Sequence, residues 1–265
     1  MIDALAHALV NLAILGAIFV PLERVFPARV QRVLRPHLAL DAAFFFGQYL
    51  VVTSAIVASL TLVAAKLPRA AFATHLPAWQ QVILAVALGD FVVYWFHRAC
   101  HRFPLLWRFH AVHHTSEHLD WLAAHREHPL DGLFTMACLN LPALLLGVRM
   151  EVLAGVAVFR GLWSIFVHSN VRLPLGPLRV LLGAPELHHW HHARVETTHN
   201  FANLAPWLDW VFGTYHCPEG EERWPLGIPE AWPRSYLRLL LTPLGLPKAG
   251  SGPLLPSPGQ TRVAR

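Results

Sequence analysis

The sequence predicts an all-α integral membrane helical bundle of about four to five membrane helices, with a cytosolic helical cap that carries histidine boxes. Two observations support this prediction. Of the 265 residues, 55% are hydrophobic and only 14% are charged, a composition more apolar than that of ordinary soluble domains. In addition, the apolar residues form long runs, whereas most of the 18 histidines gather in short segments outside them.

Three apolar segments come first along the chain, at residues 4–20, 44–65 and 82–96. Crossing a bilayer core of roughly 30 Å takes about 20 apolar residues, so the second segment is the one that spans comfortably by its own length. A fourth apolar region, residues 132–167, is interrupted at Pro142 and around residues 149–151. We interpret it as a hairpin of two short or tilted helices. Residues 243–265 are rich in Pro, Gly and Ser, which predicts a disordered tail.

Basic residues predict the orientation of these segments. Met1 is followed neither by a positive region nor by a small-residue cleavage site, so the first segment counts as a membrane helix rather than a signal peptide. The loop after it holds four arginines and the loop after the second segment holds two basic residues: Arg24, Arg29, Arg32 and Arg35 against Lys66 and Arg69. The positive-inside rule places the first of these loops in the cytoplasm. A hairpin at 132–167 then returns His168 to the same side as His97.

The first histidine box is "DFVVYWFHRACH". His97 and His101 are four residues apart, so on a helix they lie one turn apart on one face. Asp90 precedes His97 by seven residues and shares that face. We expect its carboxylate to orient His97 or His101 by accepting the second ring N–H.

Two further boxes, "FHAVHHTSEH" and "ELHHWHH", repeat the spacing i, i+3, i+4. Each trio presents three imidazoles from one helical face, an arrangement that lets a rigid helix supply several nitrogens to one metal centre. His168 in "FVHSN" and His128 in "REHPLD" complete the predicted ligands: His97, His101, His110, His113, His114, His128, His168, His188, His191 and His192. The remaining histidines fall off these faces; we expect supporting or surface roles for His118, His125, His189 and His199, and none for His7, His37, His75 and His216.

The predicted ligands indicate two metal ions, because nine or ten imidazoles exceed the six ligands that one centre can use. Soluble di-iron bundles hold their metals largely with glutamates. Here the last box has only Glu186 and Glu196 nearby, and no glutamate stands at a box position. The same absence argues against a zinc hydrolase, which needs a glutamate as general base.

From about residue 84 to 218 the chain resembles the fatty acid hydroxylase superfamily, also called the sterol desaturase family. The resemblance rests on HRxxH at 97–101, FHxxHH at 109–114, RxHP at 126–129, HxN at 168–170, HxxHH at 188–192, NF at 200–201 and FGTY at 212–215. It implies N-terminal membrane helices over residues 1–80, a catalytic domain over 81–242, two iron ions held by cytosolic histidine boxes, and supporting roles for Asn170 and Asn200. We expect that zinc can take the place of iron in isolated protein.

The sequence departs from the family pattern at two positions. Arg172 stands where some members have another histidine, and His128 is the candidate to replace it. Leu208 stands where a tryptophan usually precedes the aspartate before FGT, which we interpret as a difference in packing.

The resemblance implies hydroxylation or desaturation of a membrane lipid with O2, the substrate being an acyl, sterol, carotenoid or alkyl chain. The sequence holds no CxxCH haem motif, GxGxxG loop or ferredoxin cysteine set, so we expect electrons from a separate reductase. The alternative is a membrane protein that binds or transports metal, although transport sites usually lie near the bilayer midplane. No nucleic-acid partner is expected, because the net charge of +5 is scattered over several loops.

Overall fold

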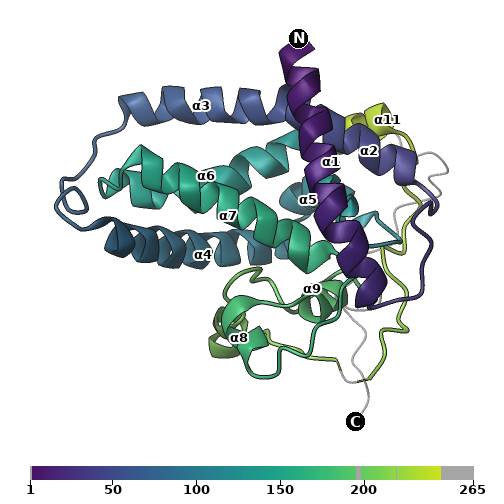
Figure 1. Ribbon diagram of the computed structural model, residues 1–265. Coiled ribbons are helices and arrows are strands. Elements are labelled where there is room, and N and C mark those ends of the chain that lie inside the picture. Colours follow the sequence, from purple (N-terminus) through teal and green to yellow (C-terminus); the bar gives the residue numbers. More distant parts are fainter. Residues whose placement is uncertain (1, 195–197, 219, 246–265) are drawn as a thin grey trace.

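The computed structural model describes residues 2–194, 198–218 and 220–245, and its regular elements are helices (Figure 1). Extended pairing within the described residues is limited to two isolated bridges, Pro27 with Val171 and Ala193 with Leu226. The predicted disordered tail begins at a short 3-10 turn, Thr242–Leu244, and its residues from 246 onward lie outside the described part of the chain.

The long helices agree with the predicted membrane segments. They are α1 (Ile2–Val25), α3 (Thr53–Lys66), α4 (Ala78–Arg102) and α7 (Met150–His168), with α3 continuing α2 (Leu38–Gly47) through a π-helical turn at Gln48–Val52. Among the described residues, four stretches are long and apolar enough to cross a bilayer: Asp3–Val25, Leu38–Lys66, Ala78–Arg102 and Met150–His168. The prediction of an all-helical membrane bundle is therefore confirmed.

The apolar region at 132–167 forms the expected hairpin. α6 (Pro129–Leu145) runs away from the histidine-bearing end of α4, and α7 returns to it (Figure 1). The expected interruption at Pro142 is wrong: this proline lies in the last turn of α6, where its missing N–H removes a single helical hydrogen bond. The chain turns instead at Gly147, whose φ of 88° favours glycine. Both histidine regions thus lie at the same end of the bundle.

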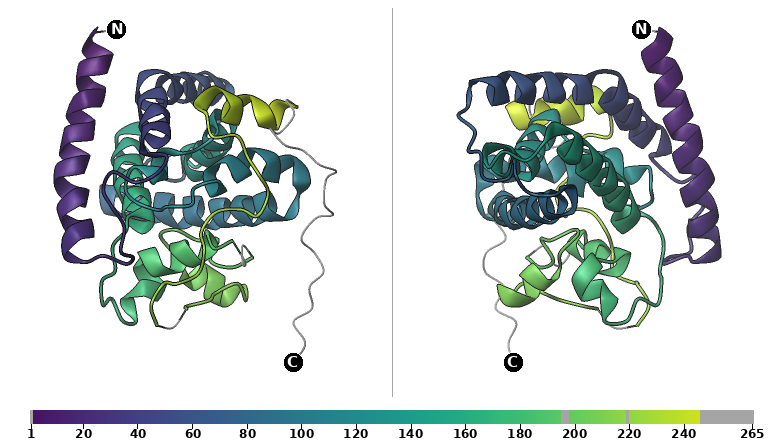
Figure 2. Two further views of the ribbon diagram at one scale, coloured as in Figure 1. Left: turned by 90° about the vertical axis from the view of Figure 1, so that its right-hand side faces the viewer. Right: turned by 60° about the vertical axis from the view of Figure 1, so that its left-hand side comes forward.

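The N-terminal helices pack directly on the histidine-bearing part of the chain. α1 runs crosswise to α3, α4 and α6 (Figures 1 and 2) and places Leu15 and Phe19 against Trp121 in one apolar core. In a second core, Phe44 of α2 meets Val112 and Leu239. On its other side α1 exposes large apolar side chains, as expected of a lipid-facing helix: Leu5, Leu9, Val10, Ile14 and Ile18.

The remaining helices are short: α5 (Pro104–His114), α8 (Leu178–Leu182), α9 (Pro185–His191), α10 (Trp207–Val211) and α11 (Tyr236–Leu241). α11 packs on α2, on the side of the bundle away from α8 and α9 (Figure 1). α5 and α9 each begin with a proline, whose fixed φ and missing N–H suit the first position of a helix. These two helices carry the two HxxHH boxes.

Candidate metal centre

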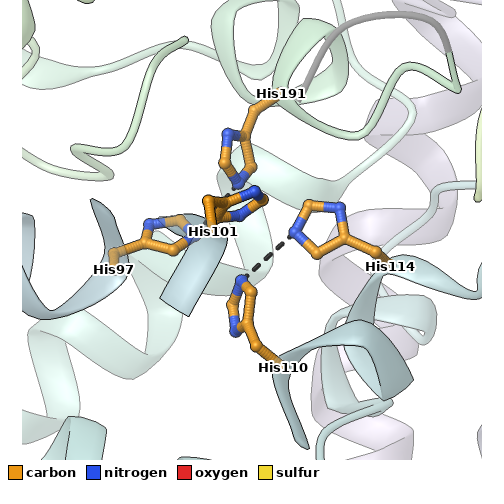
Figure 3. Close-up of side chains that lie close together, drawn as sticks. All are labelled: His97, His101, His110, His114 and His191. Atoms are coloured by element: carbon orange, nitrogen blue, oxygen red, sulfur yellow. Dashed lines mark hydrogen bonds between the residues drawn. The ribbon is translucent and has the colours of Figure 1, made fainter. Parts of the chain in front are cut away.

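Nine of the ten predicted ligands converge in two groups at the end of the bundle. In each group, every residue offers one ligand atom within 4.8 Å of the others. Group one contains His97, His101, His110, His114 and His191, whose rings point toward a common centre (Figure 3). Group two contains His113, His168, His188 and His192.

The two HxxHH boxes are each divided between the groups. In α5, His110 and His114 belong to group one and His113 to group two. In α9 and its C-cap the assignment is reversed, with His191 in group one and the pair His188 and His192 in group two. The expectation that each trio serves one centre is therefore wrong, because the i+3 residue points to the neighbouring group.

The ring nitrogens within each group approach one another closely. In group one, the Nε2 atoms of His97 and His191 are 2.9 Å apart, and those of His110 and His114 are 3.2 Å apart (Figure 3). In group two, the Nε2 atom of His168 lies 2.9 Å from that of His113 and 2.8 Å from that of His188. His192 and His188 follow at 3.1 Å.

Backbone carbonyls fix which nitrogen of several rings carries hydrogen. In group one, the Nδ1 atoms of His97 and His191 donate to the carbonyl oxygens of Phe201 and His199, at 2.6 and 2.7 Å. A carbonyl oxygen can only accept, so each Nδ1 is protonated and each Nε2 of a neutral ring has a free lone pair.

The same holds for His113 and His168 of group two, whose Nδ1 atoms donate to the carbonyl oxygens of Arg126 and Ser164 at 3.0 and 2.6 Å. In both groups, then, two lone pairs face each other at 2.9 Å with no hydrogen between them.

A metal ion satisfies this arrangement. Two imidazole nitrogens bound at right angles to one ion, each at about 2.1 Å as in zinc sites, lie about 3 Å apart, which matches the observed separations. The Nε2 atom of His101 is buried and has no hydrogen-bond partner among the described residues, as expected of a ligand atom. Sites made of imidazoles suit Zn, Cu, Fe and Ni.

The protonation state also suits metal binding. Burial lowers the pKa of His113 to about 4 and that of His191 to about 3, so both rings are neutral near pH 7. Burial lowers the pKa of His114, His188 and His192 as well. These neutral nitrogens can bind a cation without first losing a proton.

Among the described residues, Asp131 is the carboxylate that contacts a predicted ligand directly, and the sequence did not predict this contact. Its Oδ2 accepts from Nδ1 of His110 at 2.8 Å, and both side chains are buried. Asp131 occupies the first turn of α6, two residues after the proline of the RxHP motif. Its place in that helix gave no sign that it would meet a histidine 21 residues earlier.

His128 lies outside both groups, and its two ring nitrogens have other partners. Nδ1 accepts from the N–H of Leu130 at 3.1 Å, which caps α6, and Nε2 donates to the carbonyl oxygen of Leu240 at 3.0 Å. The proposed ligand set therefore contains nine histidines without His128. Arg172, at the position of the extra family histidine, donates instead to the carbonyl oxygen of Gly220 at 2.6 Å.

Asp90 does not orient a histidine, contrary to expectation. Its Oδ1 accepts from Nη2 of Arg160 at 2.8 Å, and both side chains are 8% exposed. Arg160 also donates to the carbonyl oxygens of Leu139 and Val86, which joins α7 to α6 and α4. The site for its guanidinium depends on Gly89, where a Cβ would lie 2.4 Å from Arg160 Nη1 and 2.5 Å from the carbonyl oxygen of Leu139.

The two predicted supporting asparagines hold backbone near the site without touching a ligand ring. Asn170 exchanges hydrogen bonds with the backbone of Arg29, linking the loop after α1 to the residues that follow His168. Asn200, in the left-handed region at φ 56°, donates to the carbonyl oxygens of Leu187 and His216. It directly precedes Phe201, whose carbonyl orients His97.

A second buried carboxylate, Glu222, contacts a histidine outside the two groups, His189. Glu222 accepts from Nδ1 of His189 at 2.7 Å, and Nε2 of His189 donates to the carbonyl oxygen of Ser169 at 3.0 Å. Burial alone would raise the pKa of Glu222, but His189 and Arg29 together lower it. His189 thus connects α9 to the end of α7; of the supporting and surface positions expected for it, it is buried and not at the surface.

The start of α9 depends on Gly183. Its φ is 78°, and a Cβ at this position would lie 2.0 Å from the carbonyl oxygen of Asn203. Glycine avoids both the backbone strain and this overlap. The histidines of the last box therefore rely on a glycine two residues before their helix.

Comparisons with known proteins agree with the geometry. The model of a family described as fatty acid hydroxylase matches residues 82–214. An ornithine lipid hydroxylase of Rhizobium tropici is 31% identical over 202 residues, covering 72% of this chain and 61% of the relative. An alkylglycerol monooxygenase of Homo sapiens is 33% identical over 139 residues, covering 52% of this chain and 30% of the relative.

A putative Delta(7)-sterol-C5(6)-desaturase of Arabidopsis thaliana is 26% identical over 145 residues, covering 53% of this chain and 50% of the relative. The chain therefore spans less than two thirds of the length of these relatives. No solved structure gives a significant match.

Proposed function

The chain belongs to the fatty acid hydroxylase family, and from this premise we propose that it is a membrane enzyme that uses O2 to hydroxylate or desaturate a lipid. The observation that carries the proposal is the pair of histidine groups, in which unprotonated Nε2 atoms face one another at 2.9 Å. Such an arrangement suits two adjacent metal ions. Neutral nitrogen ligands leave the positive charge of the two ions uncompensated. Metal ions bound in this way would supply the activation of O2.

The proposed ligands divide five to one ion and four to the other, as the two groups do. The protein's contribution is to aim the rings. Backbone carbonyls hold Nδ1 of four of them, and Asp131 holds Nδ1 of His110. Fixed outer partners of this kind keep a ligand in one tautomer and one orientation. We propose iron in the working enzyme and expect zinc to bind in its place in overexpressed protein.

The overall reaction requires electrons from outside the chain. Hydroxylation places one oxygen atom of O2 in a C–H bond and reduces the other to water with two electrons and two protons. Desaturation removes two hydrogen atoms and reduces both oxygen atoms to water with the same external supply. We propose a separate reductase as the donor, because the sequence holds no haem, flavin or iron–sulfur motif of its own.

The substrate is proposed to be a membrane lipid that reaches the site from the bilayer. The named relatives act on an ornithine lipid, an alkylglycerol and a sterol, and both histidine groups lie at the ends of apolar helices. The arginines between the first two spans favour a cytoplasmic position for this end. Metal transport is less consistent with the site, because the groups lie at the helix ends rather than midway along the spans.

Lipid mass spectrometry tests the reaction. Extracts of cells with and without the gene are compared for lipids that gain one oxygen atom or lose two hydrogen atoms. His113→Ala and His191→Ala should each abolish the product while leaving membrane insertion intact. His75→Ala is the matched control, since His75 is exposed in the loop at the opposite end of the bundle. Normal product from either box variant would show that the ligands are misassigned.

Metal analysis tests the centre without turnover. The purified chain should hold two metal ions, whereas His188→Ala combined with His192→Ala should hold one, because these substitutions remove half of group two and leave group one complete. A single ion in the unmodified protein, at full activity, would contradict the two-ion centre.

A further inference from the structure

A cavity of about 890 Å³ lies between the loop after α1 and the segment 221–226. Its lining includes Arg29, Arg32, Arg172, Glu222 and Val30. Arg29 donates to Glu222 at 3.2 Å and to the carbonyl oxygen of Trp224 at 2.7 Å, which holds the two walls together. A cavity of this size is within the usual range for ligand sites.

The carboxylates that line the cavity are already matched by basic groups. Glu222 lies within ion-pair distance of Arg29 and His189, and Glu221 of Arg223. Glu117 is within 3.5 Å of two arginines outside the lining, Arg194 and Arg234. The acidic residues of the lining therefore leave little negative charge for a ligand to meet.

Two of the lining arginines have no carboxylate partner among the described residues. Arg32 is exposed, and Arg172 donates to the carbonyl oxygen of Gly220. In addition, Nη2 of Arg29 is buried without a hydrogen-bond partner in the described part of the chain. A buried N–H group without an acceptor is costly, so Arg29 offers an unsatisfied donor although its charge is paired with Glu222. Arg32 and Arg172 add positive charge that no carboxylate among the described residues neutralises. Guanidinium forks match the oxygen atoms of phosphate.

The loop after α1, which forms one wall of the cavity, also carries solvent-exposed apolar side chains. Val30 is fully exposed and Leu34 is 80% exposed, and Arg32 lies between them in the sequence. The loop joins two membrane helices, α1 and α2, so it lies at the level where the bilayer meets water. Apolar side chains there can enter the acyl region while arginines remain at the headgroups.

We propose that this cavity binds the phosphate-bearing headgroup of a membrane phospholipid. Phosphate oxygens accept from Arg32, Arg172 and Nη2 of Arg29, and the acyl chains leave past Val30 and Leu34 into the bilayer. This site goes beyond the proposed oxygenase activity and does not depend on it. It is connected to the segments that carry the ligands, because Arg29 is hydrogen-bonded to Asn170, two residues after His168, and Glu222 to His189, next to His188.

Binding to the purified full chain tests the proposal without turnover. Delipidated protein is titrated with phosphatidylglycerol, with diacylglycerol of the same acyl chains, and with soluble glycerol phosphate, and bound lipid is counted by native mass spectrometry. Phosphatidylglycerol should bind more tightly than either of the others. Equal binding of diacylglycerol would remove the role of the phosphate, and equal binding of glycerol phosphate would make the ligand a soluble anion; each result overturns the proposal.

A pair of matched variants locates the site. Arg32→Gln combined with Arg172→Gln should weaken phosphatidylglycerol binding about tenfold, the effect of losing charge-assisted hydrogen bonds at a partly exposed site. The control is Arg24→Gln combined with Arg102→Gln, which removes the same charge from exposed positions outside the lining. Equal losses in the two variants would show nonspecific attraction to anionic lipid, and no loss in the cavity variant would show that the headgroup binds elsewhere. Either outcome refutes the assignment.

Discussion

Replacing Asp131 by alanine should weaken metal binding in group one about ten- to hundredfold. The carboxylate accepts the Nδ1–H of His110 at 2.8 Å, and both groups are buried. A hydrogen bond to a charged group contributes about 1.5–3 kcal/mol, and each 1.4 kcal/mol is about a factor of ten in affinity. Measured losses at outer partners of metal ligands fall in about the same range. Without its acceptor, the ring can rotate or carry its hydrogen on Nε2, which removes the lone pair that binds metal.

The affinity can be measured on the purified protein by competition with a zinc-binding dye, because nitrogen-rich sites bind zinc well. Asp131→Asn is the matched control: its amide oxygen can still accept from His110, so the loss should be smaller. Binding to group two, whose ligands do not contact Asp131, should change little. Unaltered affinity in Asp131→Ala, with the protein still folded by its melting temperature, would refute an orienting role for this carboxylate.

Three further predictions concern the fold and its orientation. Asp90→Ala and Arg160→Leu should each destabilise the protein by about 3–5 kcal/mol, because each leaves a buried charge unpaired. The double variant should recover most of this loss. Unfolding in detergent measures the stability of the three variants, and additive losses would show that the two residues are not coupled. Gly183→Ala should lower the metal content of both groups, because its methyl group would overlap a backbone carbonyl at the start of α9, and full metal content would contradict this. In a cysteine-free background, Thr198→Cys should be labelled by an impermeant thiol reagent from the cytoplasmic side and Thr74→Cys from the opposite side; labelling of both from one face would contradict the topology.

Local sequence patterns were sufficient to predict the membrane helices and most of the site. Apolar runs identified the spans, and the hairpin followed from the length of the region at 132–167. Helical spacing identified eight of the nine histidines that the structure brings together, and the HxN motif identified the ninth, His168. Each of these inferences depends on residues close in sequence, for which helix geometry fixes the relative direction of side chains.

The contacts that could not be predicted join distant parts of the chain. Asp90 shares a helix face with His97, but Arg160, 70 residues away, pairs with it. His128 belongs to a family motif, yet it caps the next helix because Pro129 starts that helix immediately after it. The partner of a polar side chain is decided by packing between helices, about which the spacing within one helix carries no information.

The division of the HxxHH boxes follows from the turn of a helix. Successive residues are rotated by about 100°, so residues i and i+4 lie about 40° apart, whereas i+3 lies about 60° to the other side of i. The i and i+4 histidines can therefore bind one ion while i+3 reaches a second. In α5 the pair belongs to group one and the single residue to group two; in α9 the order is reversed. Two such boxes facing each other supply three nitrogens to each of two centres.

The remaining ligands make the two centres unequal. α4 adds a pair one turn apart, His97 and His101, to group one, whereas α7 ends at His168 and adds one ligand to group two. The residue one turn beyond His168 would be Arg172, where some family members have a histidine, but the chain leaves the helix before it and directs this side chain to the cavity. Because α7 ends at His168, group two has four nitrogens. For the same reason Arg172 lines the cavity, where it supplies positive charge to the proposed headgroup site.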